Sequence, residues 1–455
     1  MEKDKLNFFE KLNNWIKQSI TIRLITIGIL ILLLLIPIAM VESLISEREN
    51  RKDEAIKEVS SKWGEQQTVK GIVLTIPYKT YTKVFEGDKT DKFKLVESIG
   101  YAHFLPEMLD IQGEIKPEIR YRGIYEVIVY NARLNLKGSF SKPSFKEWKT
   151  DNSDIMWDDA YLSLGLSDLR SIQEDISINW NDKKFPFNPG VESNDVIQTG
   201  ISAKFPSGSI DSLGGNSEFS LSLNFNGSSG LYFIPLGKTT KVNLNSKWEN
   251  PSFDGAFLPD KRDVTNNGFK AMWNVLHLNR SYPQQFKGSV KGIDESSFGV
   301  NLFMPVDEYQ KSMRSAKYAS MFIALTFFVF FFVQILNKVK IHPIQYIIVG
   351  LALCVFYTLL IALSEHLTFK YGYLIASVSV ICLITLYAKS IFSKKILFRL
   401  IFLILTSLYL FIYTLIQMED YALLMGSIGL FLVLATLMFL SRKINWYEIK
   451  TSGEE

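Results

Sequence analysis

The chain has 455 residues, which is long enough for two or three folding units. Its formal net charge of +4 is too small to indicate a nucleic-acid-binding protein. The two cysteines, Cys354 and Cys382, both lie in long apolar runs, so we expect no disulfide in the water-exposed part. That part must therefore be stabilised by its own hydrophobic core.

Six stretches without a charged side chain are each long enough to cross most or all of a bilayer core of about 30 Å. They lack the alternation of barrel strands, and a helix satisfies its own backbone hydrogen bonds in lipid. We therefore predict six transmembrane helices: Leu24–Val41, Tyr318–Leu336, Ile344–Leu363, Tyr371–Ala388, Leu400–Ile416 and Tyr421–Leu440.

Lysine and arginine gather on one side of these segments, which places both termini in the cytoplasm. The first segment could instead be a cleaved signal peptide, but its long apolar run and the lack of an A-x-A-like site favour an uncleaved anchor. The predicted parts are a cytoplasmic N-terminus at 1–23, an anchor at 24–41, an exported domain at 42–317, a five-helix membrane domain at 318–440 and a cytoplasmic tail at 441–455.

Charged residues flank the first apolar segment on both sides. The basic lead 1–23 could lie on the inner membrane surface, or simply begin the first helix. Residues 42–63 keep apolar side chains near helical spacing, which predicts that this helix continues outward as a stalk. The stalk is either packed on the exported domain, which we favour, or a signalling helix.

From Gly71 onward apolar residues recur at every second position, which indicates β-strands separated by turns rich in Gly, Asn and Ser. Two faces are clear: Phe219, Leu221, Leu223 and Phe225, and then Val242, Leu244 and Trp248. This pattern predicts antiparallel sheet packed on sheet, with room for a short helix in 151–172. The expected fold class is an α+β membrane protein, with a large antiparallel β-rich domain between the first and second of six transmembrane helices.

The segment SSFGVNLFMP predicts a last strand before the chain returns to the membrane. Asp307 is a suitable N-cap with Gln310 three residues later, so we predict a helix that runs unbroken into the second apolar segment. Such a helix would couple the exported domain mechanically to the membrane. Arg314 and Lys317 can extend their charged ends to the outer interface.

Several stretches are similar to a known family. RSAKYASMFIALTFFVFFFVQ and IHPIQYIIVGLALCVFYTLLIALSEHLTF in the membrane part, and RGIYEVIVYNARLNLKGSF and GFKAMWNVLHLNRSYPQQF in the exported part, resemble the CreD family of bacterial inner-membrane proteins, also described as cell-envelope-integrity proteins. The resemblance spans nearly the whole chain. It implies a multi-pass inner-membrane protein with residues 42–317 in the periplasm, associated with antibiotic-stress responses and tolerance to a colicin. It implies no catalytic residue, ligand or cofactor.

Glu365 and His366, after Ser364, form the sharpest polar cluster near the membrane, at the outward end of the third apolar segment. An ionisable pair there could relay protons, bind a metal or meet a ligand. The alternative, which we favour, is an interfacial loop whose polar groups face water or headgroups.

A second candidate lies in the exported domain, where Arg280, with Trp273 and Tyr282 nearby, could form a recognition patch for a carboxylate or a glycan. Alternatively, Trp273 is a core residue and Arg280 makes an internal ion pair, which we favour. We expect no metal and no other cofactor, because the four histidines are scattered and no H-E-x-x-H, paired-cysteine or nucleotide motif has a supporting context. Joining His277 to His366 is the remaining metal alternative.

Polar residues near the cytoplasmic ends of the apolar segments point to structural roles. His342 precedes Pro343, which suits the first turn of a helix. Gln334 and Gln345 can hydrogen-bond between helices. No apolar segment carries a charge in its middle, which weakens the hypothesis of an ion-driven transporter.

Three functions remain open. The leading hypothesis is a non-enzymatic envelope protein whose exported domain binds or senses an envelope component and conveys that state through the helix at Asp307. The second is a membrane-interface enzyme or lipid-handling protein that uses Glu365 and His366. The third is a structural scaffold. The expected partners are the lipid bilayer and an envelope component or membrane protein, and no nucleic acid.

Overall fold

The computed structural model describes residues 20–85, 93–205, 215–302, 304, 308–337, 339, 341–392, 394–418 and 421–442. The chain divides into two compact units. Asp53–Pro305 form one, which we call the sheet unit. Met1–Lys52 together with Val306–Glu455 form the other, which we call the membrane unit.

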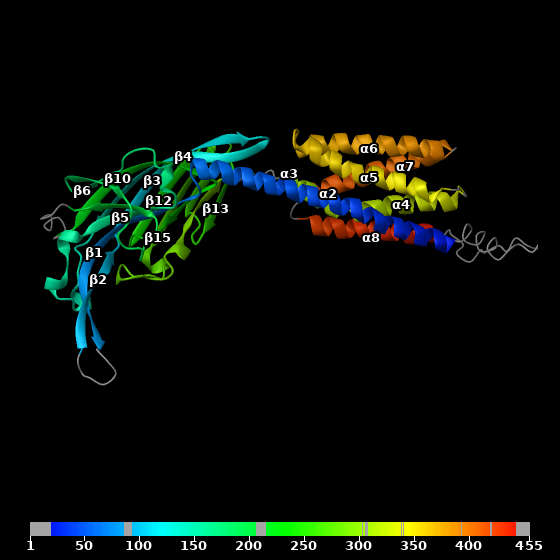
Figure 1. The fold of residues 1–455 in the computed structure, drawn as a ribbon. Coiled ribbons are helices and arrows are strands. Elements are labelled where there is room, and N and C mark those ends of the chain that lie inside the picture. The colour runs from blue at the N-terminus through cyan, green and yellow to red at the C-terminus, as the bar shows by residue number, and fades with distance from the viewer. Residues whose placement is uncertain are drawn as a thin grey trace, which may run out of the picture. The chain divides into compact units, whose positions relative to one another are not determined.

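Two large sheets make up the sheet unit (Figure 1). The first comprises β1 (Gln67–Phe85), β2 (Phe93–Phe104), β5 (Tyr161–Leu166), β8 (Asn188–Pro189), β9 (Gly200–Lys204), β11 (Gly230–Ile234), β13 (Pro251–Gly255), β16 (Gln285–Lys287) and β17 (Phe298–Leu302). The second runs in the order β14 (Lys261–Thr265), β15 (Gly268–Leu276), β12 (Thr239–Ser246), β3 (Met108–Arg122), β4 (Tyr125–Phe140), β10 (Ser217–Ser228), β6 (Ser177–Trp180) and β7 (Lys183–Pro186). The predicted packing of sheet on sheet is confirmed.

Two strand pairs are parallel, although the alternating pattern predicts antiparallel sheets. β1 runs parallel to β11, with Gln67 opposite Leu231, and β3 runs parallel to β12, with Met108 opposite Thr239. Parallel neighbours cannot be joined by a hairpin, and each pair here joins strands far apart in the chain. Alternation determines which face a side chain occupies, but it does not determine which strand lies beside it.

The hydrophobic core lies between the two sheets. Alternate residues of β10 and β12 point into it, as both predicted faces require, while Trp248 is only partly buried against it. The largest fully buried side chains of this core include Trp180, Trp273 and Phe298. Burial of apolar area on this scale supplies most of the stabilisation of the fold.

The short helix expected in 151–172 appears as three 3-10 helices: Asn152–Asp154, Trp157–Asp159 and Leu169–Ser171. Asp151 and Asp168 cap the first and third, accepting hydrogen bonds from the backbone N–H groups of Ser153 and Arg170. Aspartate side chains compete in this way for backbone donors, which favours single turns over longer helices.

One continuous helix, α2 (Ile20–Trp63), confirms the predicted extension of the first helix. Its turns from residue 53 onward belong to the sheet unit. There, Trp63 Nε1 donates to the carbonyl oxygen of Tyr130 at 3.2 Å, and the Arg120 guanidinium lies 3.7 Å from the centroid of the Trp63 ring. Arg122 Nε donates to Glu58 at 2.9 Å. The end of α2 is therefore packed on β3 and β4, the alternative that we favour.

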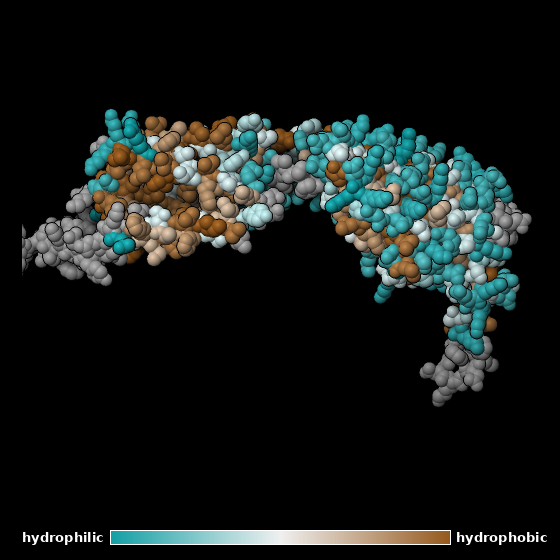
Figure 2. Space-filling view, turned by 180° about the vertical axis from the view of Figure 1, so that it is seen from behind, coloured by the Kyte–Doolittle hydropathy of each residue, from teal (hydrophilic) through white to brown (hydrophobic). Residues whose placement is uncertain are grey.

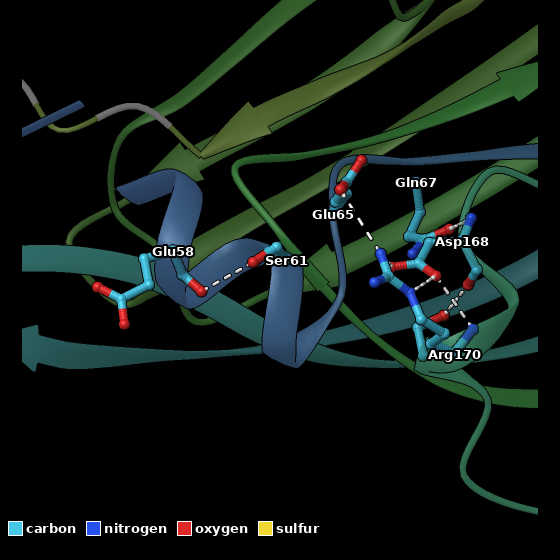
Figure 3. A network of polar contacts seen from close by, with 7 residues as sticks. Glu58, Ser61, Glu65, Gln67, Asp168 and Arg170 are labelled. Atoms are coloured by element: carbon cyan, nitrogen blue, oxygen red, sulfur yellow. Dashed lines mark hydrogen bonds and ion pairs between the residues drawn. The ribbon is translucent and has the colours of Figure 1, made fainter. Parts of the chain in front are cut away.

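Gly64 lets the chain turn from α2 into β1. Its φ is +143°, and a Cβ atom there would lie 2.8 Å from the carbonyl oxygen of Asn226. Beyond this turn, Arg170 bridges Asp168 at 2.9 Å and Glu65 at 3.6 Å, while Gln67 accepts from the Asp168 N–H at 3.2 Å (Figure 3). This network fixes the start of β1 against the turn that follows β5.

The membrane unit also contains α3 (Glu308–Lys317), α4 (Ala319–Leu336), α5 (Pro343–Ser364), α6 (Phe369–Ile391), α7 (Lys395–Gln417) and α8 (Ala422–Ser441). In the described part of the chain, α2, α4, α5, α6 and α7 are long and apolar enough to cross a membrane, and Leu424–Phe439 of α8 forms a shorter apolar helix. These helices fit the six predicted spans. Figure 2 shows hydrophobic side chains over the surface of this unit, as contact with lipid requires.

The prediction of an unbroken helix through residue 317 is wrong, because α3 ends at Lys317 and α4 begins at Ala319. At Tyr318 ψ is −1°, and its N–H donates to the carbonyl oxygen of Ser315, three residues earlier, at 3.1 Å. This tight 3-10-type turn separates the polar α3 from the apolar α4. Asp307 lies outside the described residues, so its role as N-cap stays a prediction.

Aromatic contacts tie four membrane helices together. The rings of Phe322 on α4, Phe356 on α5 and Tyr373 on α6 meet Tyr409 on α7, with centroids 4.5, 4.8 and 6.4 Å apart. The Tyr373 hydroxyl also donates to the Tyr409 carbonyl oxygen at 2.7 Å. Edge-to-face rings add to the stabilisation that burial provides.

The side chains of Gln334 and Gln345 were both predicted to form hydrogen bonds between helices, and only one of them does so among the described residues. Gln334 forms the expected interhelical hydrogen bond, accepting from the Tyr346 hydroxyl at 2.8 Å. For Gln345 the expectation is wrong, because its side-chain oxygen accepts from the His342 N–H at 2.9 Å and completes the cap of α5. His342 at the N-cap and Pro343 in the first turn are structural, as predicted.

The network around Asp168 leads to a stability prediction. Burial opposes its ionisation, but hydrogen bonds from the Arg170 side chain and backbone prevail and hold the pKa of this carboxyl below its usual value. The resulting stabilisation is present above the unfolded-state pKa of about 4 and is lost as pH falls through the folded-state pKa. We expect Asp168→Asn to lower the free energy of unfolding at pH 7 by about 1–3 kcal/mol.

Denaturant unfolding of the full chain, followed in the sheet unit between pH 7 and pH 3, measures this effect. The exposed Asp182→Asn is the matched control. The difference between Asp168→Asn and the unchanged chain should shrink toward acid pH. Equal stabilities at pH 7 would contradict the assignment.

Candidate functional site

Glu365 follows the last residue of α5 and joins three helices of the membrane unit. Tyr309 on α3 donates its hydroxyl to Glu365 Oε1 at 3.2 Å, and Nε of Arg48 on α2 lies 3.6 Å from the same oxygen. Only 11% of the Glu365 side chain is exposed. A carboxylate buried to this extent is costly unless it is paired, and the ion pair with Arg48 and the hydrogen bond from Tyr309 offset that cost.

Glu308 makes the next contact along α3. Its Oε2 accepts a hydrogen bond from the Phe369 N–H at 2.9 Å, at the start of α6. Thr368, the N-cap of α6, makes no side-chain capping bond, so Glu308 serves that purpose from another helix. A negative charge at a helix N-terminus is favourable. We call Arg48, Glu308, Tyr309 and Glu365 the Glu365 cluster.

His366 is exposed, and no hydrogen bond or ion pair of its ring is found among the described residues. Its neighbour Glu365 is directed to Arg48 and Tyr309 instead. No group of three His, Cys, Asp or Glu side chains suitable for a metal occurs in the part of the chain that the structure describes. His277 belongs to the sheet unit and His366 to the membrane unit.

Arg314 and Lys317 occupy the last turns of α3, where a positive charge is favoured by the helix dipole. Arg314 is half-buried and Lys317 is exposed. Ser312 and Ser315, which alternate with them on α3, are buried. This division gives α3 one face packed in the membrane unit and another that carries charge; anchoring at the outer interface stays a prediction.

Trp273 and Arg280 are both engaged within the sheet unit. Trp273 is completely buried, and its Nε1 donates to the carbonyl oxygen of Phe257 at 3.2 Å. The Arg280 guanidinium donates to the carbonyl oxygens of Tyr282 at 2.7 Å and Leu236 at 3.3 Å, and lies 4.2 Å from the centroid of the Tyr282 ring. Burial lowers its pKa. Trp273 is thus a core residue, and Arg280 is internal but pairs with neutral oxygens rather than a carboxylate among the described residues.

A buried network around His103 has no signal in the sequence, because its members lie far apart in the chain. His103 Nδ1 lies 3.0 Å from Thr75 Oγ1, and Nε2 lies 3.2 Å from Asp195 Oδ2, which also accepts from Ser193 at 2.8 Å. A neutral ring that donates from Nε2 and accepts at Nδ1 satisfies both contacts. The Thr75 hydroxyl is buried in mid-strand, so it is not placed to attack a substrate.

Comparison with known proteins covers both units. The family described as inner membrane protein CreD matches residues 19–447. The inner membrane protein CreD of Escherichia coli (strain K12) is 33% identical over 423 residues, which cover 92% of this chain and 91% of the relative. The matched range includes every residue of the Glu365 cluster and all of the sheet unit.

The His103 network leads to a prediction about acid sensitivity. Burial lowers the pKa of His103 and outweighs the opposing effect of Asp195. The folded state therefore favours the neutral ring, so its stabilisation is present above the unfolded-state pKa of about 6.5 and is lost as pH falls through the folded-state pKa. We expect His103→Gln to lower the free energy of unfolding at pH 7.5 by about 1 kcal/mol and to flatten its decline between pH 7 and pH 5.

Denaturant unfolding of the sheet unit within the full chain measures both effects. The partly exposed His277→Gln serves as the control. An unchanged decline in His103→Gln would show that another group titrates in this interval.

Proposed function

Because the chain belongs to the CreD family of inner membrane proteins, we propose that it is a non-enzymatic protein of cell-envelope integrity and stress response. In this proposal both termini are cytoplasmic and residues 42–317 are periplasmic. The sheet unit binds or senses an envelope component or a membrane-protein partner. The helix α3 conveys the bound state to the membrane helices, which are in contact with the bilayer.

The attachment of α3 is the observation that carries this proposal. Its first turn holds two other helices at once, through Tyr309 to Glu365 after α5 and through Glu308 to Phe369 at the start of α6. Five residues separate the end of β17 at Leu302 from the start of α3 at Glu308. A change at β17 would therefore act through a short segment on a helix that makes specific polar contacts with two others.

Side chains around the Glu365 cluster favour a mechanical role over a chemical one. Glu365 is paired with Arg48 and Tyr309, whereas His366 is exposed beside it. A general acid and base have to reach the same substrate, within hydrogen-bond distance of the proton that moves. The membrane-interface enzyme of the alternative hypothesis would need both residues, which gives a direct way to separate the two functions.

We expect Tyr309→Phe and Glu365→Gln to reduce survival under a cell-wall antibiotic at normal protein abundance, because each loosens the attachment of α3. Loss of one such hydrogen bond lowers the local opening free energy by about 1 kcal/mol. Hydrogen exchange of α3 and survival of a complemented deletion strain are the two readouts. His366→Ala is the matched control and should keep full survival; its complete loss of function would favour an enzyme.

Proline in the middle of α3 tests the conveying step separately. Met313→Pro removes a backbone donor and distorts the helix at a cost of about 3 kcal/mol, whereas Met313→Ala keeps the helix. We expect only the proline variant to lose stress tolerance at equal membrane abundance. Full tolerance in Met313→Pro would rule out transmission through α3.

A further inference from the structure

The outer face of the second sheet is hollowed into a groove. The central hollow, of about 500 Å³, shares Gln112 and Asn135 with a hollow of about 740 Å³ on one side, and Glu114 and Lys270 with a second hollow of about 740 Å³ on the other. Together their linings include residues from all eight strands, from β14 to β7. At about 4.8 Å between neighbouring strands, the groove spans on the order of 30 Å across the sheet. This length suits a polymer rather than a small molecule.

Uncharged hydrogen-bonding side chains form a line across the middle of the groove. In the strand register, Asn243 lies opposite Gln112, Gln112 opposite Asn135, and Asn135 opposite Ser222. All four alternate with buried neighbours, so they share the outer face. Gln112 Nε2 donates to Asp110 Oδ1 at 2.8 Å, which leaves it one further N–H and its carbonyl oxygen. Amide N–H groups and carbonyl oxygens are the donors and acceptors that hydroxyl and acetamido groups can satisfy.

Basic residues flank this line. The groove is lined by eight Lys or Arg and five Asp or Glu residues, and among the described residues only Lys116 of the eight forms an ion pair, with Glu114 at 3.6 Å. Arg133 and Lys137 lie one position to either side of Asn135 on this face of β4. The register places Glu114 opposite Arg133 and Asp110 opposite Lys137, but among the described residues neither pair forms an ion pair. Both basic groups can therefore still contact a carboxylate on a ligand that follows the line.

The composition of the groove disfavours other occupants. Among the described residues, Met272 is the only exposed large apolar side chain that lines it. Protein partners are recognised through buried aromatic and apolar anchors, small molecules through enclosed apolar pockets, and single-stranded nucleic acids by stacking on aromatic rings. A polar outer face is ordinary for an antiparallel sheet. A hollowed face on which lysine and arginine side chains without ion pairs lie beside a line of amides is a more specific indication of a binding site.

We propose that this groove binds a linear acidic glycan that carries acetamido and carboxylate groups. The chain of sugars lies across the strands, with its hydroxyl and acetamido groups on Asn243, Gln112, Asn135 and Ser222 and its carboxylates near Arg133 and Lys137. The inference rests on the proposed function, in which the sheet unit binds an envelope component, and it names the site and the chemical class of that component.

Binding of the full chain in lipid nanodiscs to defined probes tests the proposal. The probes are amidase-stripped peptidoglycan glycan strands, which carry acetamido and free carboxylate groups, chitin oligosaccharides as the uncharged analogue, and poly-glutamate as an acidic peptide. We expect the acidic strands to bind most tightly, the chitin oligosaccharides more weakly, and poly-glutamate not at all.

Two pairs of substitutions separate the amide line from the charges. Gln112→Ala with Asn135→Ala should weaken binding of both glycans about tenfold. Arg133→Gln with Lys137→Gln should weaken only the acidic strands. The matched controls, Gln66→Ala with Gln198→Ala and Lys142→Gln with Lys291→Gln, change exposed residues outside the groove and should leave affinity unchanged. Equal melting temperatures verify folding.

Failure of this inference differs from failure of the proposed function. If no glycan binds, if poly-glutamate binds equally well, or if the groove variants bind normally, the glycan site is wrong, although loss of tolerance in Tyr309→Phe would still support the conveying role of α3. If binding depends on the groove but the α3 variants keep full tolerance, the site stands and the conveying role fails.

Discussion

A carboxylate at the edge of an apolar helical bundle has to be paired, and the rest of the membrane unit depends on how Glu365 meets that requirement. Arg48 on α2 forms an ion pair with it, and Tyr309 on α3 donates a hydrogen bond to it. Because Glu308 next to Tyr309 also caps α6, moving α3 would leave a buried charge with one fewer donor and a helix end without its cap. The position of α3 is therefore specified by polar contacts, which can switch, rather than by a large apolar contact alone.

The Glu365 cluster and the groove of the second sheet differ in how many of their charged side chains have a partner within the protein. In the Glu365 cluster the carboxylates accept hydrogen bonds from other helices. In the groove of the second sheet most basic side chains are unpaired within the described structure. Paired groups in a buried cluster hold a conformation, whereas exposed charges without an ion pair can bind a ligand from solution. This contrast supports a division of labour in which the sheet unit binds and α3 responds.

Much of the architecture was predictable because its causes are local. Apolar length identifies the membrane helices, and period-two alternation identifies buried faces such as Phe219 to Phe225. The break at Tyr318 was not predictable, because the residues around it are compatible with a continuous helix and only the 3-10 bond to Ser315 distinguishes the two. Parallel pairing of β1 with β11 likewise depends on contacts between distant segments.

Only the local features of the candidate site could be predicted, because contacts between distant segments leave no pattern in the sequence. Glu365 stands out because it is a charge beside a long apolar run, but nothing in the sequence pairs it with Arg48, which lies more than 300 residues earlier. The amide line is also invisible, since Gln112, Asn135 and Asn243 become neighbours only through strand register. Trp273 and Arg280 are close in sequence, which suggested a shared recognition patch. Their side chains instead donate to backbone carbonyl oxygens within the sheet unit.

Hydrogen exchange of α3 in the nanodisc-embedded chain, with and without saturating acidic glycan strands, tests the central claim most directly. The account predicts that the ligand changes the exchange rates of residues 308–317, and that this change is lost in Tyr309→Phe although the glycan still binds. Saturated binding with unchanged exchange throughout α3 would contradict it.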